Sequence, residues 1–285
     1  MKEKAFLFLI AIVCVVVGVF SLALGEEKYP SRIISLGPSI TESLYLLGEG
    51  DRIIAVTTYC GRPVDARKKE KIGTIRESNT EKIVSLRPDL VIATSLTNPR
   101  TVEKLRKLGF KIVLFAEPKN YAKLCEQFIE LATLVGKEDA AAQVLKEANT
   151  RINTLREKVR GLGSPTVFIQ VGSKPLFAAT GNTFINDFIV FAGARNIADN
   201  AMSGLYSREE VLKRNPGVIL IVTMGISGER EKTVWEKYET IDAVRNKRIY
   251  SIDSDKVCSP TPLGFAKTLG EIVFILHPEL LYIAP

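Results

Sequence analysis

Two stretches of this chain repeat one pattern of polar cap, short helix, proline and apolar run. They are residues 79–94 and 207–222, and aligning them matches Glu81 with Glu209. A capped helix, a proline that stops it and a buried strand together form one unit of an α/β fold. The repeat therefore predicts two similar lobes that face each other across a cleft. Because each lobe carries a glutamate at the same place, the pattern indicates a binding protein that is recognised by a two-sided partner.

Short apolar runs alternate with helical patterns through most of the remaining sequence. The expected strands cover residues 32–36, 53–57, 90–93, 112–115, 167–171, 218–222 and 249–253. Helical or capped segments separate them, and a helix over residues 262–276 closes the fold. Alternating strands and helices favour sheets that are mostly parallel and covered on both faces. The predicted fold class is α/β, with two Rossmann-like lobes joined by one long interdomain helix.

That interdomain helix is predicted from a single pattern between the lobes. From residue 138 to residue 160, apolar side chains recur at steps of three and four, so they fall on one face. A helix of this length reaches roughly 35 Å. The predicted organisation is a first lobe over 26–136, a linker helix over 137–162 and a second lobe over 163–285. Because the hinge is a rigid helix, we expect only small changes in the width of the cleft.

The N-terminus has the pattern of a targeting segment. Lys2 and Lys4 precede an apolar run that ends in small residues near Gly25. Such a run is typical of an export signal, and about 20 apolar residues are also enough to span a bilayer. Residues 1–25 are therefore predicted to be a cleaved signal peptide or an uncleaved membrane anchor. In both cases the rest of the chain lies in the periplasm or at the extracytoplasmic membrane surface.

Composition argues against several classes of function. The net charge is +7, but basic residues are scattered among acidic ones rather than gathered in a stripe, so we expect no nucleic-acid binding. His277 is the only histidine and lies far from any strand-end loop, so no catalytic residues, no metal site and no cofactor are expected. An enzyme with Cys60 as nucleophile is the alternative of a different class, and the sequence offers no base near that thiol.

The loop after the second strand of the first lobe is a candidate ligand site, because ligands of α/β proteins bind at the carboxyl ends of strands. Tyr59 offers an apolar ring with a hydroxyl to a large flat ligand, or else it packs the loop. Cys60 is a ligand contact, half of a disulfide or an inert thiol. Ser39, which follows the first strand, is a further candidate contact or the cap of the next helix.

Two strand-end loops of the second lobe offer matching candidates. They are Gly172, Ser173 and Phe177 in one loop, and Asp255, Lys256, Val257 and Cys258 in the other. Gly and Ser permit close approach of the backbone and Phe177 supplies contact area, whereas a plain strand-to-turn connection is the alternative. Of the four cysteines, one lies in the export segment, so at most one disulfide can form. Cys258 pairs with Cys60 only if their loops meet across the cleft.

The paired glutamates have two explanations. Asn79 and Ser207 are good N-caps, which puts Glu81 and Glu209 at the second helical position. The helix dipole favours a carboxylate there by roughly 0.3–1 kcal/mol, without any further function. The other explanation is that each glutamate contacts a partner from its own lobe.

The same segments carry a family resemblance. Residues 32–42, 57–60, 81–91 and 207–212 resemble the helical-hinge substrate-binding proteins of ABC importers, and most of all the vitamin B12 (cobalamin) receptors within that group. The resemblance covers nearly all of residues 31–280. Siderophore and haem receptors share its strand–helix–Pro-Asp motif, while the Tyr59 segment and residues 167–172 favour the cobalamin branch.

This resemblance implies an exported, non-enzymatic receptor, which we expect to be a monomer, with cobalamin or a related corrinoid as its transported ligand. It implies that Tyr59 and residues 255–258 contact the corrin from opposite lobes. It also implies that Glu81 and Glu209 meet arginines on the two subunits of an ABC transporter permease dimer.

A siderophore or haem receptor of the same fold is the alternative for the ligand. Such a receptor needs basic residues or an iron-liganding side chain in the cleft. Arg62, Lys174 and Lys256 leave that alternative open at the level of sequence.

Overall fold

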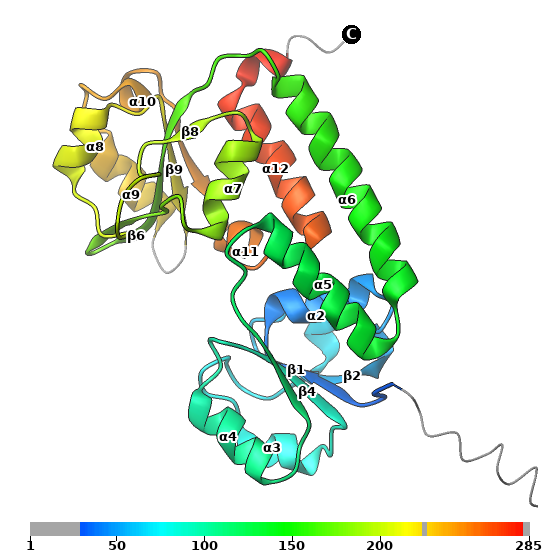
Figure 1. The fold of residues 1–285 in the computed structure, drawn as a ribbon. Coiled ribbons are helices and arrows are strands. Elements are labelled where there is room, and N and C mark those ends of the chain that lie inside the picture. The colour runs from blue at the N-terminus through cyan, green and yellow to red at the C-terminus, as the bar shows by residue number, and fades with distance from the viewer. Residues whose placement is uncertain (1–28, 224–226, 282–285) are drawn as a thin grey trace, which may run out of the picture.

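Two lobes joined along one side by long helices make up the protein (Figure 1). The structure is a computed structural model that describes residues 29–223 and 227–281. Within these two ranges, no helix has the length and apolarity needed to cross a membrane. The predicted targeting segment, residues 1–25, lies outside the described residues.

The first lobe is built on a parallel five-stranded sheet with strand order β3-β2-β1-β4-β5. Successive residues of its strand β4 enter two different apolar clusters, Leu90 and Ile92 one of them and Val91 and Ala93 the other. Both faces of the sheet are therefore covered, as expected for a parallel sheet. The elements of this lobe are β1 (Ile33–Ser35), α2 (Pro38–Leu46), η1 (Gly50–Arg52), β2 (Ile53–Val56), η2 (Val64–Lys68), β3 (Glu70–Lys71), α3 (Thr80–Ser85), β4 (Leu90–Thr94), α4 (Pro99–Lys107) and β5 (Ile112–Phe115).

The second lobe also has a five-stranded sheet, in the order β10-β9-β6-β7 with β8 paired to β6. Only the β6–β7 pair is antiparallel among the strand pairs of the described residues. The predicted α/β class with two mostly parallel sheets is confirmed. The elements are β6 (Thr166–Ser173), β7 (Leu176–Ala178), α7 (Phe184–Phe191), β8 (Arg195–Asn196), α8 (Arg208–Arg214), β9 (Val218–Val222), α9 (Gly228–Trp235), α10 (Asp242–Arg245), β10 (Ile249–Ile252), α11 (Ser254–Val257), α12 (Pro262–Leu276) and η3 (Pro278–Leu281).

The sequence repeat corresponds to one structural unit that occurs in both lobes. Helix α3 followed by β4 matches helix α8 followed by β9. The N-cap side chains accept matching hydrogen bonds, from Lys82 N–H at α3 and from Glu210 N–H at α8. The residues that precede the two prolines, Arg87 and Asn215, both have left-handed backbone, with φ of 47° and 44°. A left-handed residue commonly ends a helix, so α3 and α8 end in the same way.

Two helices, not one, pass from the core of one lobe to the core of the other. Helix α6 (Glu138–Val159) is the predicted interdomain helix, and its early residues pack in the first lobe while Ile152 packs in the second. Helix α5 (Tyr121–Val135), expected within the first lobe, also contributes to both: Tyr121 packs in the second lobe and Phe128 in the first. The hinge is therefore a pair of packed helices, which resists bending more than a single helix does.

Helix α2 begins earlier than the sequence predicted. Ser39 was a candidate for its cap, whereas the helix starts at Pro38 with Gly37 as its N-cap. Proline is well tolerated at the first helical position because the N–H it lacks has no partner there. Ser39 consequently lies in the first turn of the helix and not in a loop.

Candidate functional site

Two pockets between the lobes are lined by the carboxyl ends of strands and the segments that follow them. The smaller, about 50 Å³, has Ser39 on the first lobe and Cys258 on the second among its lining residues. The larger, about 310 Å³, has Arg62 on the first lobe and Asp255 and Lys256 on the second. The structure thus brings four of the predicted ligand contacts to the junction of the two lobes, where ligands of α/β sheets bind.

Large apolar side chains are exposed in strand-end segments of both lobes. Tyr59, in the loop after β2, is 63% exposed, and Phe177 on β7 is 41% exposed. Phe177 pairs by an isolated bridge with Leu205, which is 58% exposed. Gly172 makes room for Phe177, because a Cβ atom at Gly172 would lie 3.1 Å from the Phe177 Cβ. Phe177 and Leu205 thus form an exposed apolar pair on the second lobe, and Tyr59 is an exposed aromatic side chain on the first lobe; side chains of this kind are candidates for ligand contact.

Two predicted contacts have side chains inside a lobe rather than between the lobes. Cys60 is 1% exposed and packs in the core of the first lobe, with its Sγ 3.1 Å from Thr57 Oγ1. Val257 is buried in the core of the second lobe. Ser173 ends β6 and is half-buried. The disulfide considered between Cys60 and Cys258 is not formed, since both are free cysteines and the Cys60 side chain lies in the core.

Thiol labelling of a chain that starts after residue 25 should find three free cysteines after denaturation without reductant, and slow reaction at pH 7 when folded. Burial, together with the carboxylates of Asp255, Glu117 and Asp253, raises the pKa of Cys258 to about 11. Burial also raises the pKa of Cys125. Both thiols are therefore protonated at pH 7, and the thiolate is the reactive form. A count of one thiol per denatured chain would contradict this and indicate a disulfide.

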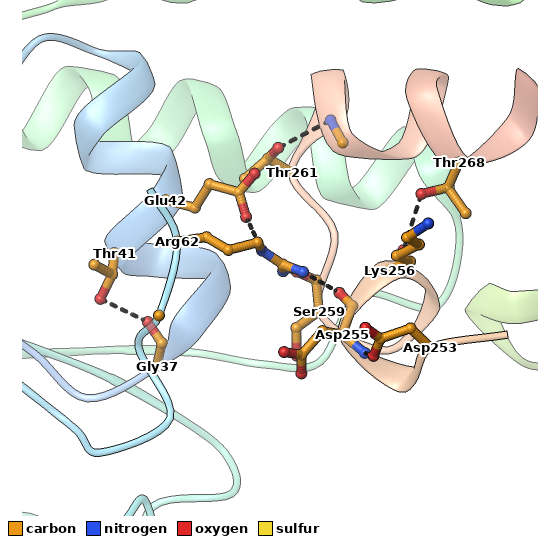
Figure 2. Close-up of polar contacts among 12 residues, drawn as sticks. Gly37, Thr41, Glu42, Arg62, Asp253, Asp255, Lys256, Ser259, Thr261 and Thr268 are labelled. Atoms are coloured by element: carbon orange, nitrogen blue, oxygen red, sulfur yellow. Dashed lines mark hydrogen bonds and ion pairs between the residues drawn. The ribbon is translucent and has the colours of Figure 1, made fainter. Parts of the chain in front are cut away.

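The Arg62 side chain makes hydrogen bonds to groups on both lobes (Figure 2). Its Nε donates to Glu42 Oε2 on α2, 2.8 Å away, within the first lobe. Its terminal nitrogens donate to main-chain carbonyls of the second lobe, Nη1 to Asp255 at 2.8 Å and Nη2 to Ser259 at 3.1 Å. From the sequence, Arg62 could be recognised only as a basic residue available to a ligand, because a single arginine after a strand carries no signal of an interlobe bond.

The charges that line the larger pocket balance one another. Four carboxylates and four basic side chains take part: Glu42, Asp253, Asp255 and Glu271 against Arg62, Arg67, Lys256 and Lys267. Several are already paired, since Lys256 Nζ lies 2.6 Å from Glu271 and Arg62 is bonded to Glu42. The pocket therefore offers no net positive charge to an anionic ligand.

The repeated glutamates lie at the starts of α3 and α8, elements that lie away from α6 in Figure 1. Glu81 is exposed and has no ion-pair partner within residues 29–223 and 227–281. Beside it is a pocket of about 330 Å³ with Val84 and Leu108 among its lining residues. Hydrogen bonds from its own backbone N–H and from Ser207 lower the pKa of Glu209, which is therefore ionised at neutral pH.

Short connections link these glutamates to the apolar strand-end residues. In the first lobe, Thr58 N–H donates to Gly73 O at 2.9 Å, and Gly73 is bridged to Ser78, just before α3. In the second lobe, Leu205 is followed within a few residues by α8. In the first lobe the connection is therefore a backbone hydrogen bond between the Tyr59 loop and the segment before α3, and in the second lobe it is continuity along the chain.

Comparison with known proteins places this fold and site in a family. A family model described as "periplasmic binding protein" matches residues 33–256. A vitamin B12-binding protein of Vibrio vulnificus is 30% identical over 234 residues, which cover 81% of this chain and 85% of that protein. The periplasmic vitamin B12-binding protein of Vibrio cholerae is 26% identical with a TM-score of 0.73, over 88% of this chain and 98% of that one.

A third similar protein is described differently. It is a possible iron-binding, periplasmic solute-binding protein of Staphylococcus epidermidis, 28% identical with a TM-score of 0.80, over 88% of this chain and 100% of that one. These matches confirm the resemblance to helical-hinge substrate-binding proteins of ABC importers, which bind a solute for transport and are not enzymes. The chain belongs to the periplasmic binding protein family.

Proposed function

We propose that this protein captures cobalamin or a related corrinoid outside the cytoplasm and delivers it to an ABC importer. The observation that carries the proposal is the set of exposed apolar side chains on both lobes, Tyr59 on one and Phe177 with Leu205 on the other. A large rigid ligand gains affinity from apolar walls, while a few polar groups fix its orientation. The vitamin B12-binding protein of Vibrio vulnificus, similar over 81% of this chain, supports the same choice.

The balance of charge in the interlobe pocket supports a ligand without strong negative charge. Arg62 and Lys256 are bonded to carboxylates of the protein, so using either for an anionic ligand would first break an existing ion pair. Corrinoids present a broad apolar ring system edged by neutral amides, which matches such a surface. Haem carries two propionates and many ferric siderophores are anionic, and cations that are already paired with carboxylates would bind such groups weakly.

An iron-carrying ligand is the second candidate, favoured by the similarity to the possible iron-binding protein of Staphylococcus epidermidis. Tyr59 is the residue that could serve either ligand, because an exposed phenol can stack on a ring or coordinate iron.

Titration of the mature protein with cyanocobalamin, haemin and a ferric siderophore should show saturable, tight binding for cyanocobalamin only. Phe177→Ala should weaken that binding by about tenfold or more, because burying such a side chain contributes about 1.5–3 kcal/mol. Phe274→Ala removes an exposed phenylalanine near the end of α12 and should leave the affinity unchanged. Preference for haemin or the siderophore would replace the corrinoid proposal by the iron-ligand one.

For delivery, we propose that Glu81 and Glu209 bind basic residues on the two permease subunits. Two features support this role: both glutamates are exposed, and both lie in the first turn of matched helices. The apolar pocket beside Glu81 adds contact area on the same face of α3, since Glu81 and Val84 are one turn apart. The export of the chain, through residues 1–25, is part of the same proposal.

A further inference from the structure

We propose that Arg62 is a positioning residue that fixes the angle between the two lobes and thereby the width of the ligand cleft. The inference does not concern ligand contact: it assigns to Arg62 a mechanical role beside the helical hinge. It depends on the proposed receptor function only for the choice of ligand probe.

The first step is that the guanidinium is held on its own lobe before it reaches the other. Glu42 on α2 accepts a hydrogen bond from Nε at 2.8 Å, and both side chains are largely shielded, 34% and 21% exposed. An arginine is planar and presents its nitrogens in a fixed fork, so anchoring one edge orients the two terminal nitrogens. The orientation of the bonds toward the second lobe is therefore set by the first lobe.

The second step concerns what the terminal nitrogens meet. Asp255 O lies within the short helix α11 and Ser259 O just beyond it, at 2.8 Å and 3.1 Å. The last carbonyls of a helix have no partner inside the helix, and a cation near them is favoured. Arg62 thus supplies hydrogen bonds that the backbone of the second lobe would otherwise take from water.

The third step is that the Glu42 carboxylate also lies close to the second lobe. Glu42 Oε1 lies beside the first turn of α12, 3.7 Å from the place of a Cβ atom on Gly264. A negative charge is favoured near a helix N-terminus. Figure 2 shows Glu42 beside Thr261 at the start of α12, and Arg62 beside Ser259 in the segment after α11.

Together these contacts form a third connection between the lobes, in addition to α5 and α6. Two packed helices limit how far the lobes swing apart, and a bonded charge pair beside them selects one angle within that range. The carbonyls that it holds belong to residues 255–259, the loop that also contains predicted ligand contacts. Arg62 therefore sets both the spacing of the lobes and the position of that loop.

The test is an interlobe distance measurement by double electron–electron resonance, without ligand. Spin labels are attached through Glu103→Cys on α4 and Lys237→Cys after α9, both exposed. The chain used starts after residue 25, so that it lacks Cys14, and has Cys60, Cys125 and Cys258 changed to alanine. Arg62→Ala should broaden the distance distribution and shift its mean. Arg62→Lys should give an intermediate result, because an ammonium cannot reach all three acceptors at once.

Arg67→Ala is the matched control. Arg67 lines the same pocket and carries the same charge, but its Nε donates to Gly61 O within the first lobe, at 3.1 Å. Its removal should leave the distribution as in the parent. An unchanged distribution in Arg62→Ala, or equal broadening in Arg67→Ala, would overturn the proposal.

A second readout is the affinity for cyanocobalamin. If only about one tenth of Arg62→Ala molecules have the binding-competent angle, the apparent Kd rises about tenfold. A loss of affinity with an unchanged distance distribution would identify Arg62 as a ligand contact instead and overturn its positioning role. If the parent protein does not bind cyanocobalamin, that result counts against the proposed ligand alone, and the distance measurement still decides the role of Arg62.

Discussion

The double variant Glu81→Ala/Glu209→Ala is expected to abolish stimulation of the importer's ATPase activity while ligand affinity stays unchanged. Truncating one partner of a charge pair that is buried on docking costs about 2–5 kcal/mol. Two such losses amount to roughly 4 kcal/mol or more, about a thousandfold in the affinity of receptor for transporter. The measurement is ATP hydrolysis by the importer reconstituted in lipid nanodiscs, with increasing amounts of receptor.

Asp139→Ala is the control for that experiment. Asp139 is also an exposed carboxylate at the second residue of a helix, α6, so its loss removes the same helix-dipole stabilisation. Asp139 lies on the hinge helix rather than on α3 or α8, so this variant should still stimulate the ATPase activity of the importer. If the double variant stimulates ATP hydrolysis as the parent does, the glutamates only stabilise their helices and the docking role is wrong.

Phe265→Ala is expected to lower the free energy of unfolding of the second lobe by about 3–5 kcal/mol. Phe265 on α12 is fully buried, and its ring centroid lies 4.2 Å from that of Phe188 on α7 and 4.6 Å from that of Tyr121 on α5. Removing the ring leaves a cavity where three elements meet, one of which is a hinge helix. The change therefore also loosens α5 from the second lobe.

Urea denaturation followed by tryptophan fluorescence measures this effect. Trp235 is the only tryptophan and is buried in the second lobe, so the signal reports on that lobe. Phe274→Ala changes the same residue type on the same helix at a site that is 39% exposed, and should cost under about 1 kcal/mol. An equal loss of unfolding free energy in the two variants would show that the aromatic cluster does not stabilise the packing of α5 against the second lobe.

Much of the fold could be predicted because its signals are local. The repeat at residues 79–94 and 207–222 contains its own caps, proline stops and apolar runs, and the structure gives both copies the same helix, left-handed residue and strand. The long helix α6 followed from the spacing of its apolar residues. The start of α2 was missed because a proline after an apolar run fits the end of a strand as well as the first residue of a helix.

The candidate site was less predictable, because its side chains are oriented by contacts between distant segments. Cys60 directly follows Tyr59 in the chain, yet Tyr59 is exposed whereas Cys60 packs in the core of the first lobe. The pattern of a short loop does not specify which of two neighbours faces inward. Helix α5 has one continuous apolar stripe, and nothing in the stripe reveals that its two ends belong to different cores.

The amino-acid sequence was enough to predict two similar lobes, a rigid helical connection and a glutamate on each lobe, since caps and apolar periodicity act over a few residues. How the lobes are held together beside the hinge depends on contacts between segments that are distant in the chain. Arg62 bonds to carbonyls almost two hundred positions further along the chain, at Asp255 and Ser259. Every residue has a main-chain carbonyl, so no pattern of side chains could predict that hydrogen bond. It forms because folding brings α2, α11 and α12 close together.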